Sequence, residues 1–168
     1  FLKAFIAAAK EFPSFNANTT KDSIILKSDY NIGIAMDTPR GLLVPNIFQA
    51  QTKSIITIAN EISNLIQKGK ESKISNEDMS NGTFTITSLG AKGGQFFTPI
   101  LNYPQTAILG IGEISKKPIV SNDKIVIGNV LHLSLTFDHR AIDGAEAAKF
   151  FTKLCELLKD VNLLLMEA

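Results

Sequence analysis

Residues 130–144 read VLHLSLTFDHRAIDG, and they connect the strongest strand pattern of the chain to its clearest helical pattern. Leucines alternate with polar residues through residues 130–137, which is the pattern of a β-strand with two different faces. A helical pattern follows over residues 145–159. The sequence therefore predicts a strand and a helix joined by a short loop, and that loop contains His139.

Outward from this stretch, the chain mixes strands and helices without strict alternation. Strands are predicted over residues 23–27, 32–36, 42–44, 83–87 and 106–114, a hairpin within 119–127, and helices over 2–10 and 53–68. We expect residues 42–44 to be buried and Gly69 to end the second helix. Such a mixture favours an α/β fold, a two-layer sandwich with a mixed β-sheet, over a doubly wound parallel sheet.

The composition excludes several classes of protein. The 168 residues include 17 lysines and arginines against 16 acidic residues, a formal net charge of +1, and 45% are hydrophobic. Binding to nucleic acid or to an anionic membrane favours a surplus of basic side chains. No apolar run approaches the roughly 18 to 20 residues that cross a bilayer. We therefore expect one folded domain with neither nucleic acid nor a membrane as its partner.

Cysteine usage and the first residues give two further expectations. Cys155 is the only cysteine, which excludes an internal disulfide and a multi-cysteine zinc site and fits a reducing compartment. Its apolar helical neighbours predict a structural role for this thiol. The chain begins at Phe1 in an apolar helix without a capping residue, so we expect that upstream sequence is missing.

His139 is the strongest candidate for chemistry. It follows a predicted strand, where loops carry many functional groups, and imidazole suits proton transfer near neutral pH. A structural interpretation also exists, because Asp143 followed by Glu146 resembles a helix capping box and Asp138 with Arg140 can form an ordinary ion pair. Position alone leaves both interpretations open.

Two other features favour structural roles. His132 alternates with Ser134 and Thr136 on the polar face of its strand, which predicts a hydrogen-bonded strand residue. The glycine-rich residues 90–94 are predicted to form a tight surface connection rather than a phosphate-binding loop, because no Walker or dinucleotide motif surrounds them.

The motif DHRxxDG at residues 138–144 resembles the signature of the dihydrolipoamide acyltransferase cores of 2-oxo acid dehydrogenase complexes. Similar segments occur in the family's order along nearly the whole chain: IAMDTPRGLLVP at 34–45, GTFTITSLG at 82–90, FTPILN at 97–102 and AILG at 107–110. The resemblance implies a chloramphenicol acetyltransferase-like fold. It also implies that residues 1–168 are one acyltransferase catalytic domain lacking its N-terminal part, with the lipoyl and subunit-binding domains absent.

The resemblance implies a reaction and the residues that perform it. An acyl group moves between dihydrolipoamide and coenzyme A in a ternary complex, so both are expected as substrates, the lipoyl group being carried on a domain absent here. His139 matches the general base that takes the proton from the attacking thiol. Thr87 matches the hydroxyl that donates to the oxyanion, and Asp143 matches a position that orients the site. No metal is expected.

The family's assembly is implied as well. Its cores form homotrimers with active sites between neighbouring subunits, and the trimers build octahedral or icosahedral cages. The expected partners are the lipoyl domain, the decarboxylating dehydrogenase and dihydrolipoamide dehydrogenase. Residues 94–99, GQFFTP, and the ending 163–168 are similar to pyruvate-type acetyltransferases, which predicts acetyl as the acyl group. The expected location is the cytoplasm, or the mitochondrial matrix in a eukaryote.

Two alternatives to this function stay open. A chloramphenicol acetyltransferase shares a His-x-x-x-Asp-Gly element, but Asp138 and Arg140 around the histidine favour the dehydrogenase-complex cores. A non-catalytic scaffold subunit is the second alternative. The presence of both His139 and Thr87 counts against it, because a scaffold needs neither side chain.

Overall fold

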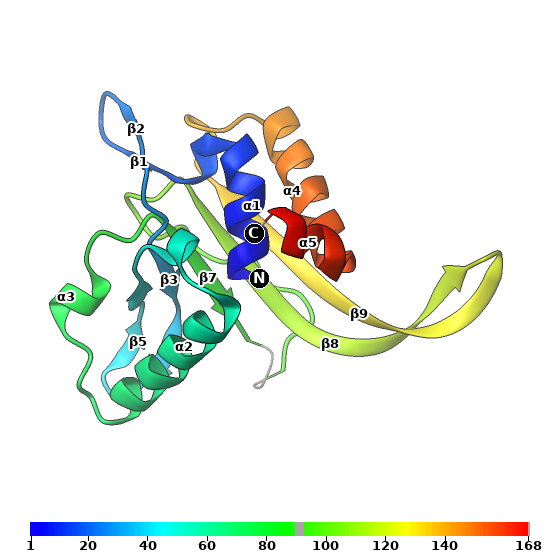
Figure 1. The fold of residues 1–168 in the computed structure, drawn as a ribbon, viewed down its shortest axis with the longest axis horizontal. Coiled ribbons are helices and arrows are strands. Elements are labelled where there is room, and N and C mark those ends of the chain that lie inside the picture. Colours follow the sequence, from blue (N-terminus) through cyan, green and yellow to red (C-terminus); the bar gives the residue numbers. More distant parts are fainter. Residues whose placement is uncertain (90–92, 168) are drawn as a thin grey trace.

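The main sheet has five strands in the order β6-β3-β7-β8-β9 (Figure 1). The computed structural model of the chain describes residues 1–89 and 93–167. The central neighbours β3, β7 and β8 run parallel, whereas β6 and β9 are antiparallel to the strands beside them. The strands are β3 (Ile32–Ile34), β6 (Asn46–Ile47), β7 (Phe84–Ser88), β8 (Ala107–Ser121) and β9 (Lys124–Phe137). The predicted mixed sheet is confirmed.

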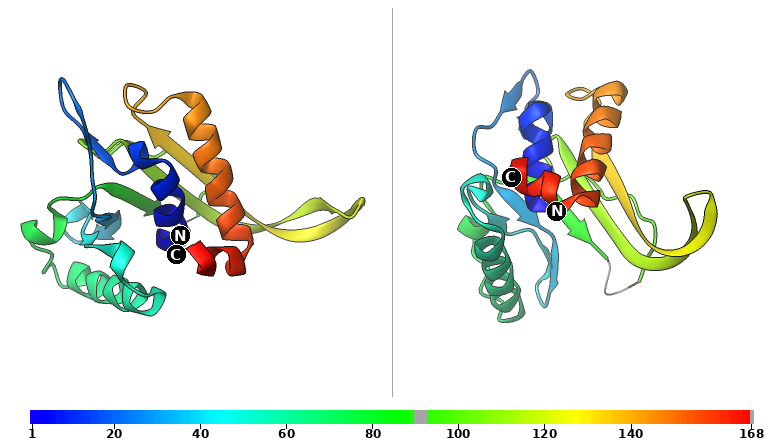
Figure 2. Two further views of the ribbon diagram at one scale, coloured as in Figure 1. Left: turned by 45° about the horizontal axis from the view of Figure 1, so that its top comes forward. Right: turned by 45° about the vertical axis from the view of Figure 1, so that its right-hand side comes forward.

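Helices α1 (Leu2–Glu11), α4 (Gly144–Lys159) and α5 (Val161–Glu167) lie over one face of this sheet (Figures 1 and 2). Buried aromatic rings pack between the two layers and also within the helical layer. Phe5 of α1 stacks on Phe84 of β7 with 3.7 Å between ring centroids, and Phe15 stacks on Phe150 of α4 at 3.8 Å. Large buried rings of this kind dominate core energetics. The two-layer sandwich is therefore observed. The alanine-rich helix α1 is itself buried, because it packs inside this sandwich.

A second group of elements lies beside the main sheet. Helix α2 (Ile55–Lys70) packs on the hairpin of β4 (Met36–Thr38) and β5 (Gly41–Leu43). The remaining elements are short: β1 (Ala17–Thr19) paired with β2 (Ile24–Leu26), helix α3 (Asn76–Met79), and 3-10 turns at Pro13–Phe15 and Ala50–Thr52.

Two expectations about this second group are wrong. Gly69 lies inside α2 rather than ending it, and a Cβ there would lie 3.1 Å from Met36 Sδ and 3.3 Å from Thr38 Cγ2. Its lack of a side chain lets the helix approach β4 closely. Residues 42–44 are not a buried strand, since Leu42 is 72% exposed. Among the described residues, strand β5 pairs with β4 alone, at the surface, so one edge of the hairpin has no neighbouring strand.

Strands β8 and β9 continue past the helices as a long two-stranded ribbon (Figure 1). The ribbon turns at Asn122 and Asp123, whose φ angles of 50° and 58° suit a tight hairpin turn, as predicted for this position. We call residues 114–131 the arm. Four large apolar side chains of the arm are between 65% and 80% exposed: Ile114, Val120, Ile125 and Ile127. The described helices include none long and apolar enough to span a bilayer.

Candidate functional site

His139 lies in a tight turn that its neighbour Asp138 closes. The Asp138 carbonyl accepts hydrogen bonds from the amides of Ala141 (2.9 Å) and Ile142 (3.1 Å). The Asp138 amide donates to the carbonyl of Thr106 at 2.8 Å, which ties the turn to the start of β8. The His139 side chain is exposed, with its ring 5.7 Å from that of Phe137. The imidazole therefore projects to solvent from a backbone that is held on both sides.

An ion pair stabilises the same turn. Arg140 donates from Nε to both Asp138 carboxylate oxygens, at 2.9 and 3.1 Å, and from Nη2 at 2.6 Å. These hydrogen bonds from Arg140 hold the pKa of Asp138 at about 2, against an ordinary value of 3.8. Asp138 is thus ionised at neutral pH and acts as the acceptor that shapes the turn. The predicted pair between Asp138 and Arg140 is present.

Asp143 caps helix α4. Its carboxylate accepts a 2.8 Å hydrogen bond from the amide of Glu146, and this bond is the main reason that the pKa of Asp143 is lowered. The side chain of Glu146 accepts instead from the Ser14 hydroxyl. Half of the expected capping box is therefore confirmed, and the other half is replaced by a bond to the segment after α1. The nearby His139 also contributes to the lowered pKa of Asp143, which places the two side chains in one electrostatic environment.

Thr87 is a half-buried residue near the end of β7. It pairs with Gly110 of β8, which in turn pairs with Ser134 of β9. Side chains alternate along a strand, so Thr87 faces away from Phe84 and Ile86, which point into the core beneath the helices. The hydroxyl of Thr87 therefore lies on the sheet face that the helices leave uncovered, with a glycine beside it.

The register separates Thr87 from His139 within one chain. Two strand spacings, about 9.6 Å, lie between Thr87 and Ser134, and β9 runs a further ~10 Å from Ser134 to its last residue, Phe137. Thr87 and Phe137 are thus about 14 Å apart, and His139 lies two residues beyond. Groups that act on the same reacting atoms must approach them to about 3 Å. One chain alone does not bring these two candidates to one reaction centre.

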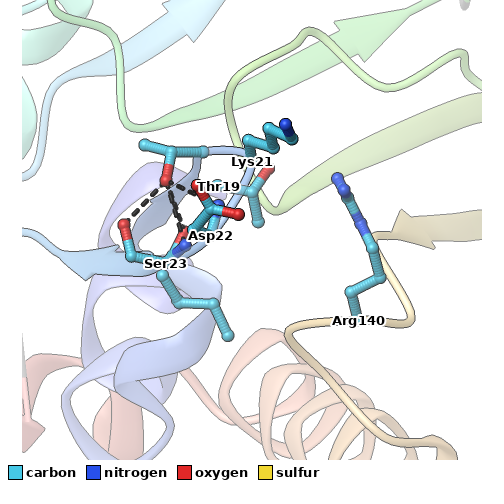
Figure 3. Close-up of a pocket in the computed structure, with 7 residues that line it drawn as sticks. Thr19, Lys21, Asp22, Ser23 and Arg140 are labelled. Carbon is cyan, nitrogen blue, oxygen red and sulfur yellow. Dashed lines mark hydrogen bonds between the residues drawn. The ribbon is translucent and has the colours of Figure 1, made fainter.

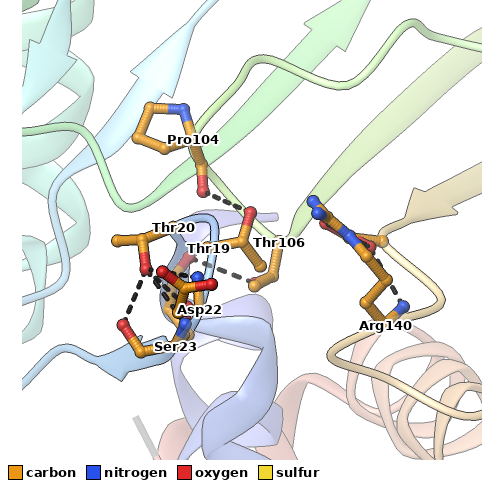
Figure 4. Close-up of polar contacts among 9 residues, drawn as sticks. Thr19, Thr20, Asp22, Ser23, Pro104, Thr106 and Arg140 are labelled. Carbon is orange, nitrogen blue, oxygen red and sulfur yellow. Dashed lines mark hydrogen bonds and ion pairs between the residues drawn. The ribbon is translucent and has the colours of Figure 1, made fainter.

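A cavity of about 330 Å³ lies beside the His139 turn (Figure 3). It is lined by the β1–β2 turn, residues 19–24, and by Arg140. Thr19 in its wall donates from its amide (2.7 Å) and its hydroxyl (3.4 Å) to the carbonyl of Pro104 (Figure 4). Lys21 and Asp22 make the opening polar. Sequence reasoning did not find these residues, because the β1–β2 turn is far from residue 140 in the sequence and carries no motif.

The other singled-out residues have structural surroundings. His132 Nε2 is 2.9 Å from Lys117 Nζ, and the His132 ring packs on Phe96 with 3.9 Å between centroids, so the expected hydrogen-bonded strand histidine is confirmed. Cys155 is partly buried in α4, and this burial raises the pKa of its thiol. Residues 90–92 of the glycine-rich stretch lie outside the described residues. Within the described part of the chain, no group of three His, Cys, Asp or Glu side chains is placed to hold a metal ion.

The chain belongs to the family of 2-oxoacid dehydrogenase acyltransferases (catalytic domain), whose model matches residues 1–166. Among curated relatives, the dihydrolipoyllysine-residue acetyltransferase component of the pyruvate dehydrogenase complex from Staphylococcus epidermidis is 45% identical over 168 residues, and its Staphylococcus aureus counterpart is 46% identical. Both alignments cover 99% of this chain and 39% of the relative. The chain therefore spans about two fifths of the length of these proteins.

Solved structures agree with this assignment. Dihydrolipoamide acetyltransferase from Azotobacter vinelandii matches with a TM-score of 0.93 and 40% identity, over 98% of this chain and 68% of the other. The cubic core of a pyruvate dehydrogenase multienzyme complex matches with the same TM-score and coverage at 41% identity. A chloramphenicol acetyltransferase has a TM-score of 0.54 at 16% identity, covering 91% of this chain and 73% of that one. This last similarity shows a shared fold, as expected.

Proposed function

We propose that this chain transfers an acetyl group between dihydrolipoamide and coenzyme A within the core of a pyruvate dehydrogenase complex. The observation that carries the proposal is the exposed His139 on a rigid turn at the end of β9, in a chain that belongs to an acyltransferase family. Residues 1–168 act as one catalytic domain, and the lipoyl group arrives on a lipoyl domain that these residues do not include. The proposed location is the cytoplasm, or the mitochondrial matrix in a eukaryote.

His139 acts as the general base. An ordinary thiol has a pKa near 8.5 and an ordinary imidazole one near 6.5, so full proton transfer costs only about 2.7 kcal/mol. The imidazole removes the proton from the attacking thiol as its sulfur bonds to the thioester carbonyl carbon. When the tetrahedral intermediate collapses, the other sulfur leaves and takes the proton back. No acyl-enzyme is needed, because the attacking thiol is itself the acceptor.

Thr87 and Asp143 complete the proposed site. The Thr87 hydroxyl donates to the oxyanion of the intermediate, and one such donor contributes on the order of 3 kcal/mol to catalysis. Asp143 orients the segment that begins α4. In the Azotobacter vinelandii enzyme, a serine, a histidine and an asparagine were investigated for their role in the catalytic mechanism, and they lie 52 and 4 positions apart. Thr87, His139 and Asp143 have the same spacing, which supports these roles.

The site is proposed to form between copies of the chain. Thr87 and His139 lie too far apart in one chain, so Thr87 of one copy and His139 of another serve the same reaction. The exposed apolar side chains of the arm support contact with another copy, because a two-stranded ribbon is marginally stable without a covering layer. The copies form a trimer that builds a larger cage. The lipoyl domain, the decarboxylating dehydrogenase and dihydrolipoamide dehydrogenase are its proposed partners.

A transfer assay tests the function. The assembled protein is supplied with dihydrolipoamide and with acetyl-, succinyl- or isobutyryl-coenzyme A, and the release of free coenzyme A is followed. We expect turnover when dihydrolipoamide and an acyl-coenzyme A are both present, with the highest kcat/KM for acetyl-coenzyme A. Turnover with chloramphenicol but not with dihydrolipoamide would assign the chain to the other enzyme class. No transfer to either acceptor would leave only a scaffold role.

A further inference from the structure

Residues 94–99, which we call the strap, cross the sheet face that the helices leave uncovered. The strap starts at Gly94, whose carbonyl accepts a hydrogen bond from the amide of Glu113 (3.3 Å). It then runs along β8 and β9 as far as Pro99, which is buried. A pocket of about 20 Å³, room for about one water molecule, lies between residues 95–97 and strands β8 and β9. The strap therefore packs directly on the sheet.

Alternate residues of β9 hold successive parts of the strap. The Ser134 hydroxyl donates to the carbonyl of Phe97 at 2.7 Å, and the Thr136 hydroxyl donates to the carbonyl of Pro99 at 2.8 Å. One step earlier on the same face, the His132 ring packs on Phe96. The polar residues that alternate with the leucines of β9 are thus a row of anchors, because the period of a strand directs all three to one face.

Glycines of β8 make room for the strap. A Cβ on Gly112 would collide with the carbonyl oxygen of Gln95. A Cβ on Gly110 would lie 3.0 Å from Phe97 Cζ and 3.1 Å from Pro99 Cδ. The same Cβ would lie 2.5 Å from Ser134 Oγ, so the strap and its Ser134 anchor together take the space that a side chain at position 110 would occupy.

The strap lies next to the Thr87 hydroxyl. Thr87 pairs directly with Gly110, so the Thr87 side chain points the same way as a side chain at position 110 would. The two positions are about 4.8 Å apart. The Ser134 hydroxyl, Phe97 and Pro99 occupy the space over Gly110. A thioester whose carbonyl oxygen accepts from Thr87 therefore lies close to the strap.

We propose that Ser134 is a positioning and specificity-determining residue, which holds the strap beside Thr87 and so limits the size of the acyl group. This inference rests on the proposed function. In this proposal, a strap fixed over Gly110 opposes acyl groups larger than acetyl by contact. Releasing its central anchor lets the strap move away, so a branched acyl group gains access while acetyl loses some of its close fit.

Ser134→Ala tests the inference, with Ser63→Ala as the matched control. Ser63 lies on α2, and its hydroxyl also donates to a backbone carbonyl, that of Ala59 at 3.0 Å, so both variants lose the same kind of bond. In the assembled protein we expect the ratio of kcat/KM for acetyl- over isobutyryl-coenzyme A to fall about tenfold in S134A and to stay at the wild-type value in S63A. Thr136→Val is expected to shift the ratio in the same direction.

Hydrogen–deuterium exchange separates this inference from the proposed function. The amides of residues 93–101 are expected to exchange faster in S134A than in the wild type or in S63A. Unchanged exchange in that segment would show that Ser134 does not hold the strap, and faster exchange with an unchanged acyl ratio would show that the strap does not set acyl size. Both results overturn the inference. If the wild type transfers neither acyl group, the proposed function itself fails, and the exchange data still decide whether Ser134 is an anchor.

Discussion

At the scale of single residues, Asp138 gives His139 its fixed backbone. Its carboxylate is 10% exposed and is bonded to Arg140, which is 66% exposed, so solvent partly screens the pair. We expect Asp138→Asn to lower the free energy of unfolding at pH 7 by about 1 kcal/mol, as for partly exposed ion pairs. The turn carrying the imidazole is expected to loosen at the same time.

The pH dependence of this effect has a definite sign. The pKa of Asp138 is about 2 in the folded chain, and its ordinary value of 3.8 applies to the unfolded chain. The ionised carboxylate therefore stabilises the fold above about pH 4. That contribution is lost as the pH falls through about 2. Urea unfolding at pH 7 and at pH 2 is therefore expected to show a gap between wild type and D138N that closes at the lower pH. A gap of equal size at both values would contradict the assignment.

Thr87 is the second residue with a separable role. Thr87→Val keeps the shape of the side chain and removes its hydroxyl. If the hydroxyl donates only to the oxyanion, kcat is expected to fall about 100-fold while both KM values change little, because the lost bond exists mainly in the transition state. Steady-state kinetics with each substrate varied measures this. A large rise in KM at constant kcat would assign Thr87 to substrate binding instead, and Thr87→Ser serves as the conservative control.

The sequence predicts these residues unequally. His139 is a candidate from its position just after a strand with a clear period of two, but position alone leaves a structural role open, and the resemblance to a family assigns it as the base. Thr87 is one of several threonines in an alternating strand, and only the resemblance to a family singles it out. The neighbourhood of Arg140 is unpredictable from local pattern, because it depends on a long-range approach of the β1–β2 turn.

At the scale of elements, Asp143 links the site to helix α4. Asparagine caps helices as well as aspartate does, whereas alanine does not. We therefore expect Asp143→Asn to keep the thermal stability and most of the activity, and Asp143→Ala to lower both. Thermal unfolding followed by circular dichroism and the transfer assay provide the measurements. A stable but inactive D143N would show that the negative charge itself is required.

Element types were predictable where one periodicity dominates, as in α1, β7, β9 and α4. The errors have a tertiary origin. Gly69 has the usual chemistry of a helix end, but packing of α2 on Met36 and Thr38 keeps it inside the helix. Residues 42–44 are apolar enough for a core strand, yet β5 pairs only with β4 and stays at the surface. The strap was not predicted, because its anchors on β9 resemble ordinary exposed polar positions until its path is known.

At the scale of the whole molecule, the two-layer sandwich places its candidate groups at different ends. His139 lies beyond the last residue of β9, and Thr87 lies nearer the arm. A contact that brings the His139 end of one copy to the Thr87 end of the next is head-to-tail, and such contacts close into rings when the rotation allows. The fold was predictable from the mixture of strands and helices without strict alternation and from the family resemblance. The separation of the two groups required the strand register.

The central claim is that His139 of one copy and Thr87 of another form one active site. His139→Ala alone is expected to keep the assembly intact by light scattering, because the side chain is exposed, and to reduce transfer at least 100-fold. Thr87→Val alone is similarly impaired. Neither variant has a site with both groups.

Co-expression of the two differently tagged variants, followed by tandem purification of mixed assemblies, gives the most direct measurement. With random mixing in equal amounts, about a quarter of the sites between neighbouring copies receive both native residues in a head-to-tail ring. We expect the mixed assemblies to regain about a quarter of wild-type transfer activity. Mixed assemblies that are no more active than the separate variants would contradict an active site shared between two copies.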